Sequence, residues 1–176
     1  ISGSLGINWG SDDANVLGNT GLDAQKDRGV GFTQETLDAL ASQVLTSDGV
    51  SMVYALSENG TVLTAYKDNG AGGFGERVFV ASVSDAENGS YTFQLIGNLD
   101  HQAGLSENNT TIQFPFTAQD SDGSKASSTF SIIVNDDSPV IGAPENGSVN
   151  EDDLTGESEG PLFAKAVSEG DSAEGS

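Results

Sequence analysis

Acidic side chains stand on both sides of one hydrophobic segment, "TAQDSDGSKASSTFSIIVNDDSP" (117–139). Asp120 and Asp122 precede the apolar run, and Asp136 and Asp137 follow it. The chain has little to offset these charges, because it holds 27 Asp and Glu but only 6 Lys and Arg. Calcium takes about six to eight oxygen ligands from carboxylates, amides and backbone carbonyls, which such loops provide. The pattern therefore predicts that Ca²⁺ binds between these carboxylates.

Three further stretches repeat the pattern, "WGSDDAN" (9–15), "NLDHQAGLSENN" (98–109) and "NEDD" (150–153). One Asp-x-Asp-Gly motif, as at 120–123, is not specific by itself. Its recurrence in a cysteine-free chain with a formal charge of −21 favours several calcium ions. The predicted metal ligands are Asp12, Asp13, Asp100, Glu107, Asp120, Asp122, Asp136, Asp137 and Asp152. The alternative is a halophilic or merely soluble acidic surface, in which these side chains bind nothing.

Catalysis is not predicted. His101 is the only histidine, and no Ser or Cys nucleophile stands in an elbow or at a helix start beside it. We expect His101 to make hydrogen bonds within its loop. A glycosidase with paired carboxylates is the least favoured reading, because these acids lie in polar loops and that chemistry needs an apolar pocket. Other acids are expected to be solvated loop charges, namely Glu58, Asp68, Glu76 and Asp85.

The net charge also limits the partners. Nucleic acid and anionic membrane surfaces are unfavourable, because binding phosphate requires clustered Lys and Arg. No apolar run approaches the length that spans a bilayer, so no direct membrane insertion is expected. The absence of cysteine rules out disulfides, and in a secreted protein bound metal ions are the usual alternative reinforcement.

Alternation of apolar and polar residues predicts β-strands that must position these loops. Two hairpins are expected, one over 50–67 and one pairing "RVFVASV" (77–83) with "SYTFQLI" (90–96). Asn-Gly and Asp-Gly steps recur at the predicted turns, which favours tight reversals. Two more strands follow, "TIQFPFTA" (111–118) and "STFSIIV" (128–134). The candidate core side chains are Phe79, Ala81, Val83, Tyr91, Phe93, Leu95, Ile112, Phe114, Phe116, Ala118, Phe130, Ile132 and Val134.

The fold class expected from this pattern is all-β, an antiparallel β-sandwich in the style of immunoglobulin and cadherin domains. One short helix is predicted over 33–44, with Thr33 as its N-cap, and we expect it to cover an open end of the sandwich. Pro115 indicates an edge or bulged strand. "NGAGGFGER" (69–77) is expected to be a flexible loop. Residues 1–141 are expected to form the calcium-stabilised sandwich, and 142–176 an acidic linker or lead-in to a following module.

Taken in order, the motifs resemble a known family. "SGSLGINWGSDD", "LTSDGVSMVYALSENGTVLTAY", "VFVASV", "GSYTFQLIGNLDH", "FPFTAQDSDGS" and "STFSIIVNDDSP" are similar to the long repeat module of giant type I-secreted RTX adhesins of Gram-negative bacteria. The resemblance spans roughly residues 2–140, and the order "LDH…DSDG…VNDDSP" is its most specific part. "VNEDDL" (149–154) resembles the acidic lead-in found before another module.

The resemblance implies a sandwich that folds on binding several calcium ions, with the acids named above as ligands. It also implies an extracellular location on the bacterial surface and a role in attachment and biofilm formation, with neighbouring modules of the same chain as partners. Some related domains bind a peptide or glycan on another cell. The helix at 33–44 and the loop "NGAGGFG" do not match the repeat, which leaves such a ligand-binding role open. Candidate ligand-binding aromatics are Trp9, Tyr66 and Phe74.

Overall fold

The computed structural model describes residues 1–22, 26–101 and 109–135, which lie within one compact unit, Ile1–Ser138. The boundary predicted at residue 141 and the acidic extension 142–176 fall outside the described residues.

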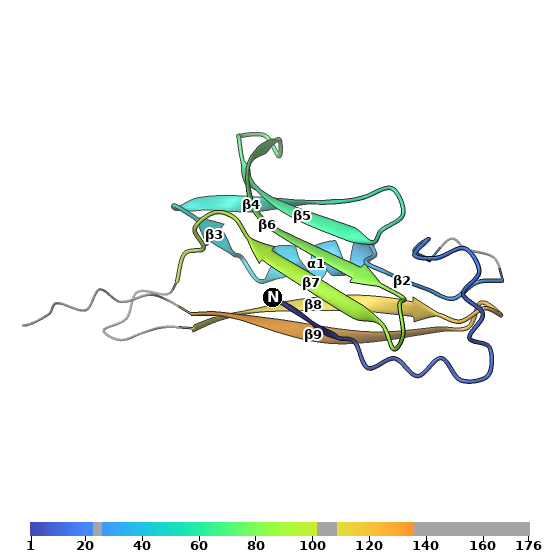
Figure 1. Cartoon of the computed structure of the whole chain (residues 1–176). Helices are drawn as coiled ribbons and strands as arrows, with labels where there is room; N and C mark the ends of the chain where they lie inside the picture. Colours follow the sequence, from blue (N-terminus) through green and yellow to red (C-terminus); the bar gives the residue numbers. More distant parts are fainter. Residues whose placement is uncertain (23–25, 102–108, 136–176) are drawn as a thin grey trace, which may run out of the picture. The chain divides into compact units, whose positions relative to one another are not determined.

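Two antiparallel sheets face each other in this unit (Figure 1). The first sheet has the strand order β1-β7-β6-β5-β4-β3, and the second has the order β2-β8-β9. The strands of the first sheet are β1 (Ser2–Ser4), β3 (Thr46–Ser47), β4 (Val50–Leu56), β5 (Val62–Asp68), β6 (Phe74–Ser84) and β7 (Ser90–Leu95). Those of the second are β2 (Gly29–Gly31), β8 (Asn109–Gln119) and β9 (Lys125–Asn135). The all-β sandwich predicted from the alternation is confirmed, as are the two predicted hairpins, β4–β5 and β6–β7.

Phenylalanine rings fill the space between the sheets. Phe79 and Phe93 from the first sheet meet Phe114 of the second edge-on, with ring centroids 5.8 and 5.9 Å apart. Phe130 stacks on Phe114 at 5.0 Å, and Phe32 packs beside both rings. Phe79 and Phe114 are fully buried, so the predicted inward faces of β6 and β8 are confirmed. Leu95, at the end of β7, is 41% exposed, and its predicted place in the core is wrong.

Helix α1 (Gln34–Ser42) forms where the sequence predicts it. The Thr33 backbone N–H donates to the Thr36 hydroxyl at 3.0 Å, which completes the N-terminal cap. We expected the helix to cover an open end of the sandwich, and this is wrong. It packs along the side of the sandwich against β8 and β4. β2 pairs only with the last three residues of β8, so the rest of that edge needs other partners.

Two polar side chains from α1 and its C-terminal cap satisfy this edge. The Gln43 side-chain amide donates to the Gln113 carbonyl at 3.0 Å, and its oxygen accepts the Gln113 N–H at 2.9 Å. Thr36 donates its hydroxyl hydrogen to the Pro115 carbonyl at 2.8 Å. The helix therefore takes the place of a neighbouring strand. Pro115 has a strand partner on one side only, which confirms the predicted edge position.

The loop in the glycine-rich segment 69–77 is shorter than predicted. β6 begins at Phe74, and the turn before it is held by Asp68, whose Oδ1 accepts the N–H groups of Gly70 and Gly72 at 2.8 and 3.1 Å. The flexible loop expected over 69–77 is therefore a bonded turn followed by strand. This turn projects from the first sheet in Figure 1.

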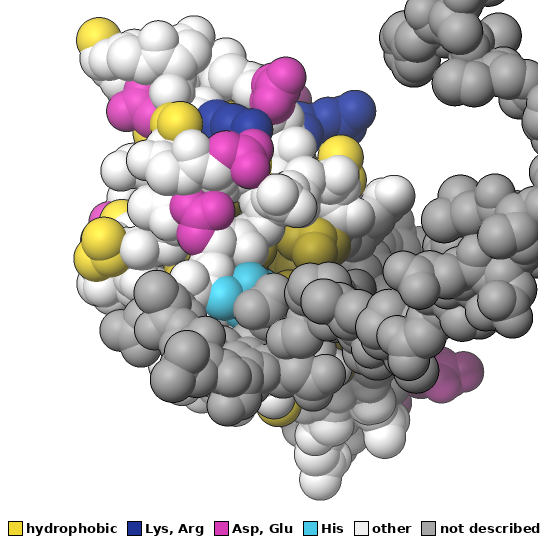
Figure 2. Space-filling model, turned by 90° about the vertical axis from the view of Figure 1, so that its left-hand side faces the viewer, with side chains coloured by type: hydrophobic (Ala, Val, Ile, Leu, Met, Phe, Trp, Pro, Cys, Tyr) yellow, Lys and Arg dark blue, Asp and Glu magenta, His cyan; other side chains and the backbone are white. Residues whose placement is uncertain are grey.

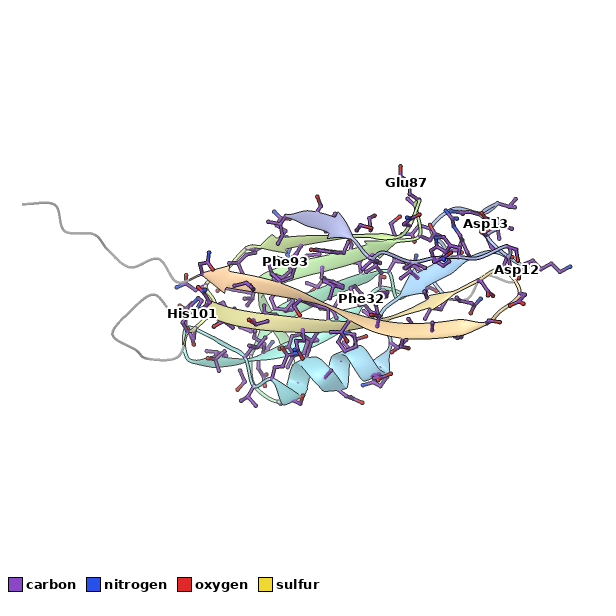
Figure 3. All side chains as sticks on the ribbon, turned by 90° about the horizontal axis from the view of Figure 1, so that it is seen from below. Asp12, Asp13, Phe32, Glu87, Phe93 and His101 are labelled. Carbon is purple, nitrogen blue, oxygen red and sulfur yellow. The ribbon has the colours of Figure 1, made fainter. Side chains whose placement is uncertain are left out.

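The loops gather at two opposite ends of the sandwich (Figure 3). We call one the Asp12 end, formed by residues 5–22 and the turns 57–61, 85–89 and 120–124. The other is the His101 end, formed by residues 96–101 and the turns 47–49 and 69–73. Asp12, Asp13 and Glu87 lie at the first, and His101 lies at the second (Figure 3).

Within the described ranges, no helix combines the length and apolar character needed to cross a membrane.

Candidate cation sites at the Asp12 end

The turn between β8 and β9 holds two of the predicted ligands, Asp120 and Asp122. Asp120 Oδ1 accepts the N–H groups of Asp122 and Ser124 at 3.2 and 2.8 Å. Asp122 Oδ1 accepts the N–H and the hydroxyl hydrogen of Ser124 at 3.0 and 2.7 Å. Gly123 adopts a φ of +96°, which closes the turn and which L side chains rarely adopt.

This turn also brings the two carboxyl groups together. A hydrogen bond with the Asp120 carboxyl group lowers the pKa of Asp122, followed by the bonds from Ser124. Two carboxyl groups in contact favour a shared proton or a bound cation, because two adjacent negative charges repel. Both residues are near the surface, so a cation can reach them from solvent.

A second predicted site meets this turn. The Ser121 N–H donates to the Asp12 carbonyl oxygen at 3.0 Å, so the segment 9–15 lies against the β8–β9 turn. Asp12 and Asp13 therefore reach the same end of the sandwich as Asp120 and Asp122, although a hundred or more residues separate them in sequence. Carboxylates and a backbone carbonyl from two loops form the kind of donor set that calcium prefers.

A pair of buried carboxylates lies behind these loops, and sequence reasoning did not find it. Asp27 and Asp85 are 1% and 2% exposed. Asp27 accepts the N–H groups of Val16 and Leu17, one at each carboxylate oxygen, at 2.7 and 2.8 Å. These two bonds hold residues 16 and 17 against the start of β2. In the sequence "QKDRG", Asp27 stands between two basic residues, as a surface acid would.

Asp85 was expected to be a solvated loop charge, and this is wrong. Its burial raises the pKa of its carboxyl group, while the nearby Arg28 charge and a hydrogen bond with Asn15 act in the opposite direction. The residue follows β6 and continues the inward-facing series Phe79, Ala81 and Val83. That period-two series was the sequence signal that could have placed Asp85 inside.

Arg28 and Trp9 close this region on the solvent side. The Arg28 guanidinium lies 5.0 Å from the centre of the Trp9 ring, and its Nη1 donates to the Asp13 carbonyl at 3.4 Å. The Trp9 indole N–H donates to the Glu87 carbonyl at 2.7 Å. A polar pocket of about 490 Å³ is lined by Trp9, Asp13, Arg28 and Glu87, among others. It gives solvent access to the Arg28 side of the cluster.

A tight glycine contact fixes how the loop over this region runs. Gly21 has a φ of +76°, and a Cβ atom there would collide with the carbonyl oxygen of Asn59. The chain can therefore pass this close to the β4–β5 turn only with glycine at this position.

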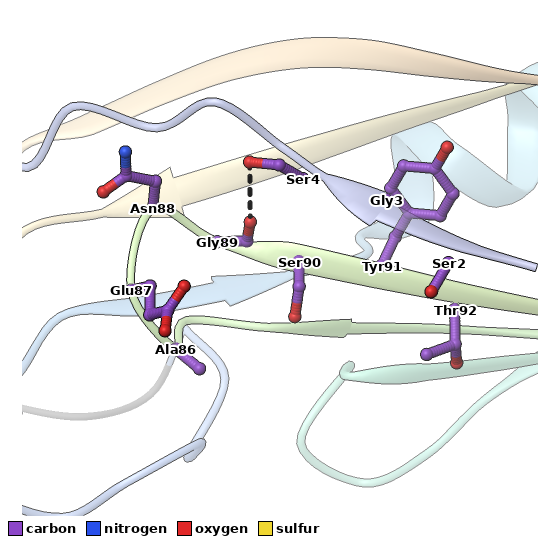
Figure 4. Close-up of a pocket in the computed structure, with 10 residues that line it drawn as sticks. All are labelled: Ser2, Gly3, Ser4, Ala86, Glu87, Asn88, Gly89, Ser90, Tyr91 and Thr92. Atoms are coloured by element: carbon purple, nitrogen blue, oxygen red, sulfur yellow. Dashed lines mark hydrogen bonds between the residues drawn. The ribbon is translucent and has the colours of Figure 1, made fainter.

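A wider groove lies beside this pocket, between β1 and the β6–β7 turn (Figure 4). It has a volume of about 820 Å³ and is open to solvent. Across it, the Ser4 hydroxyl donates to the Gly89 carbonyl at 3.4 Å. Glu87 is the one charged side chain in its lining, so it offers little for recognising a charged ligand.

At the opposite end, Asp100, another predicted ligand, holds a tight turn. Its two carboxylate oxygens accept the N–H groups of Asp48 and Gly49 at 2.9 and 2.7 Å. The bond from Gly49, followed by one from the Thr46 side chain, lowers the pKa of Asp100. Asp48 and Gly49 both have positive φ and form the tight turn between β3 and β4. His101 shares a hydrogen bond of 3.1 Å with Thr110 at the start of β8.

Acidic and basic side chains lie close together on this end, above the single histidine in Figure 2. Lys67 pairs with Asp48 at 2.6 Å and with Glu76 at 3.1 Å. Its hydrogen bond lowers the pKa of Asp48, with a further contribution from Asn98. Here the protein supplies its own positive charge.

The three candidate aromatic residues do not form one groove. Tyr66 and Phe74 lie together near the projecting β5–β6 turn, with ring centroids 4.9 Å apart, and Phe74 is 56% exposed. Trp9 is 8% exposed and bonds to the turn after β6, at the other end of that strand. Roughly 30 Å of extended chain, the length of β6, separate the two places.

The remaining predicted ligands, Glu107, Asp136, Asp137 and Asp152, lie outside the described residues. Across residues 1–22, 26–101 and 109–135, no three or more Asp, Glu, His or Cys side chains converge closely enough to hold a metal by themselves. A cation at the Asp12 end would therefore take amide, carbonyl or water oxygens as well as carboxylates, as calcium commonly does.

No family model, no curated protein and no solved structure matches this chain.

Proposed function

We propose that this chain is a calcium-dependent extracellular module of a large bacterial RTX adhesin that supports surface attachment and biofilm formation. The adhesin part of the proposal rests on the ordered motifs that resemble the repeat module. The calcium part is carried by one observation, the contact between the Asp120 and Asp122 carboxyl groups on a turn that binds the Asp12 carbonyl. Asp12, Asp120 and Asp122 would hold an ion there and tie the two loops together.

Calcium supplies the positive charge that the chain lacks, with a formal charge of −21. Where calcium is scarce, the repulsion between carboxylates favours the unfolded chain, which suits passage through a secretion channel. Outside the cell, the binding free energy becomes folding free energy. The neighbouring modules of the adhesin would be the natural partners of a module stiffened in this way.

Thermal unfolding with chelator and with millimolar CaCl₂ tests this proposal. If about four sites each bind at a hundredfold their dissociation constant, each contributes about 2.7 kcal/mol. The unfolding midpoint then rises by roughly 20 to 40 °C for a chain of this size. NaCl at equal ionic strength is the control, because screening alone also stabilises an acidic protein. An unchanged midpoint, or an equal rise in NaCl, would support the merely acidic surface instead.

A matched pair of variants locates part of this effect. Asp122→Asn should reduce the calcium-induced rise, because it removes one charge from the proposed ligand set. Glu58→Gln makes the same charge change at an exposed position of the same end and should leave the rise unchanged. Equal behaviour of the two variants would remove the Asp120–Asp122 turn from the proposal.

A second candidate function is capture of a glycan or peptide, and the Tyr66–Phe74 pair favours it. An exposed aromatic pair on a projecting turn offers a flat apolar surface beside the acidic side chains of Asp68 and Glu76. Sugar rings and aromatic peptide side chains stack on such surfaces. Binding to an array of glycans and peptides separates this candidate from a spacer role, which predicts no ligand.

A further inference from the structure

Asp85 carries a carboxylate oxygen that the described protein does not satisfy. Its side chain is 2% exposed, and its Oδ2 has no hydrogen-bond partner among the described residues. An ionised carboxylate buried in this way costs several kcal/mol unless a proton, a bound water or a cation compensates it. A group other than the described side chains is therefore expected at this oxygen.

The groups around Asp85 are oxygen donors from three parts of the chain. Asn15 lies within hydrogen-bonding distance of the Asp85 carboxyl group, and the Asp27 charge is close enough to affect it. Asn15 comes from the loop after Trp9, Asp27 from the residues before β2, and Asp85 from the end of β6. The Asn15 amide and the Asp27 charge thus both act on the Asp85 carboxyl group at the end of β6.

Arg28 offsets only part of this negative charge. Its guanidinium lowers the pKa of Asp85 through space, but the ion pairs between described residues are those of Lys67 alone. Arg28 is instead held over the Trp9 ring and bonded to the Asp13 carbonyl. Two buried carboxylates against one guanidinium leave a net negative charge in a place of low dielectric, which attracts a cation.

We infer that Asp85, Asn15 and Asp27 form a second calcium site, with Asp85 Oδ2 as its principal ligand. This inference rests on the proposed function, because it assigns one of the proposed ions to named residues. All the side-chain donors are oxygen atoms, which suits a hard cation and disfavours zinc or copper. Backbone carbonyls of the surrounding loop and water can fill the rest of a calcium shell, whereas Mg²⁺ demands a stricter octahedron. The ion would fasten the segment around Asn15 and the residues before β2 to the end of β6.

A competing arrangement needs no metal. Arg28 Nε is also buried without a partner among the described residues, and a water molecule reaching both atoms would satisfy Nε and Asp85 Oδ2 together. A proton on Asp85 would also remove its charge. These arrangements predict calcium binding that does not depend on Asp85.

Calcium titration of the whole chain distinguishes them, with Trp9 as the reporter. Trp9 is the only tryptophan, and its indole bonds to the carbonyl of Glu87, two residues beyond Asp85. Wild type, Asp85→Asn and Glu87→Gln are compared by tryptophan fluorescence and by the number of ions bound at equilibrium dialysis. Glu87→Gln is the matched control, because it removes one exposed charge from the same turn.

The expected result is a calcium-dependent change of Trp9 emission in wild type and Glu87→Gln. In Asp85→Asn this change should shift to at least about tenfold higher calcium, a fold-change that corresponds to one lost charged ligand, and one fewer ion should bind. Equal titrations and equal stoichiometry in all three proteins would overturn the inference in favour of a water or a proton. That outcome leaves the proposed function standing if the unfolding midpoint still rises with calcium. If the wild-type protein binds no calcium, both the proposed function and the Asp85 site are contradicted.

Asn15→Asp provides a second variant, should Asp85→Asn fail to fold. Asn15 is exposed, so the substitution should not disturb the core. A carboxylate in place of the amide should tighten calcium binding at the Trp9-reported site and should destabilise the protein in chelator. Unchanged calcium affinity would count against the site, because a network of Arg28 and water gains nothing from calcium.

Discussion

Asp27 and Asp100 have the same hydrogen-bonding geometry at opposite ends of the sandwich. Each carboxylate accepts two consecutive backbone N–H groups, one at each oxygen, at distances between 2.7 and 2.9 Å. Asp27 is 1% exposed and has the buried Asp85 as a neighbour, whereas Asp100 is partly exposed to solvent. Identical bonds therefore serve in one place to fasten a long loop and in the other to close a short turn.

The two ends also differ in how they balance charge. At the His101 end, backbone N–H groups and Lys67 neutralise the acids Asp100, Asp48 and Glu76. At the Asp12 end, the Asp120 and Asp122 carboxyl groups share a hydrogen bond, and the Asp27 charge acts on the buried Asp85, whose charge Arg28 offsets only in part. The number of acids alone does not reveal a cation site. What matters is whether the protein already satisfies them.

The largest expected effect on stability comes from removing Asp27, the buried one of the two carboxylates that accept consecutive backbone N–H groups. Asp27→Ala should lower the free energy of unfolding by about 3 kcal/mol, because two charge-assisted hydrogen bonds are lost at a buried position. Asp100→Ala loses the same two bonds where water can replace them, and should cost about 1 kcal/mol. Urea unfolding of both variants in chelator measures the difference. Equal losses would show that burial does not distinguish the two ends.

A smaller effect is expected in the pH dependence of stability in chelator. Burial raises the pKa of Asp85, so its contribution favours folding below the unfolded pKa, near about 4, and declines as pH rises through it. Hydrogen bonding lowers the pKa of Asp100, so its contribution is present above the unfolded pKa and is lost as pH falls.

Relative to wild type, Asp85→Asn should therefore be least stable in acid and gain toward neutral pH. Asp100→Asn should show the reverse trend. Denaturant unfolding from about pH 3 to about pH 7, on both sides of the ordinary carboxyl pKa of about 4, provides the measurement. Trends of the same sign in both variants would contradict the contrast between the two ends.

The smallest expected effect on stability concerns the exposed aromatic pair at the His101 end. Phe74→Ser should cost less than about 1 kcal/mol, because only the contact with the Tyr66 ring is lost at a side chain that is 56% exposed. If the projecting turn captures a glycan or peptide, the same change should abolish array binding. Binding that survives in Phe74→Ser would place the ligand elsewhere, and Asn88→Ala, at the edge of the groove beside β1, is then the natural next variant.

Much of the fold was predictable because its signals are local. The alternation of Phe79, Ala81 and Val83 predicts a half-buried strand, and Asp48–Gly49 predicts the tight turn that the structure contains. Thr33 followed by apolar residues at helical spacing predicts α1. The position of α1 was not predictable, because it depends on the open edge of β8 that Gln43 and Thr36 satisfy across 70 or more residues of sequence.

The candidate site was predictable only in part. Asp12, Asp120 and Asp122 could be named because acids at predicted strand ends stand out in the sequence, and the structure places their loops together. Asp85 could have been predicted as buried, because it continues the alternation of inward-facing residues along β6, although its loop position favours a solvated charge. Asp27 offers no such signal, since it stands between Lys26 and Arg28 as a surface residue would.

The sequence by itself therefore determined the strands, the tight turns and a large excess of negative charge, because these follow from residue type and from spacing along a short stretch of chain. Only the tertiary structure decided which carboxylates meet, which of them the backbone satisfies and which are left buried without a partner. The reason is that contacts such as that of Asp12 with the β8–β9 turn, or of Asn15 with Asp85, join segments far apart in sequence, and their meeting depends on how the two sheets pack.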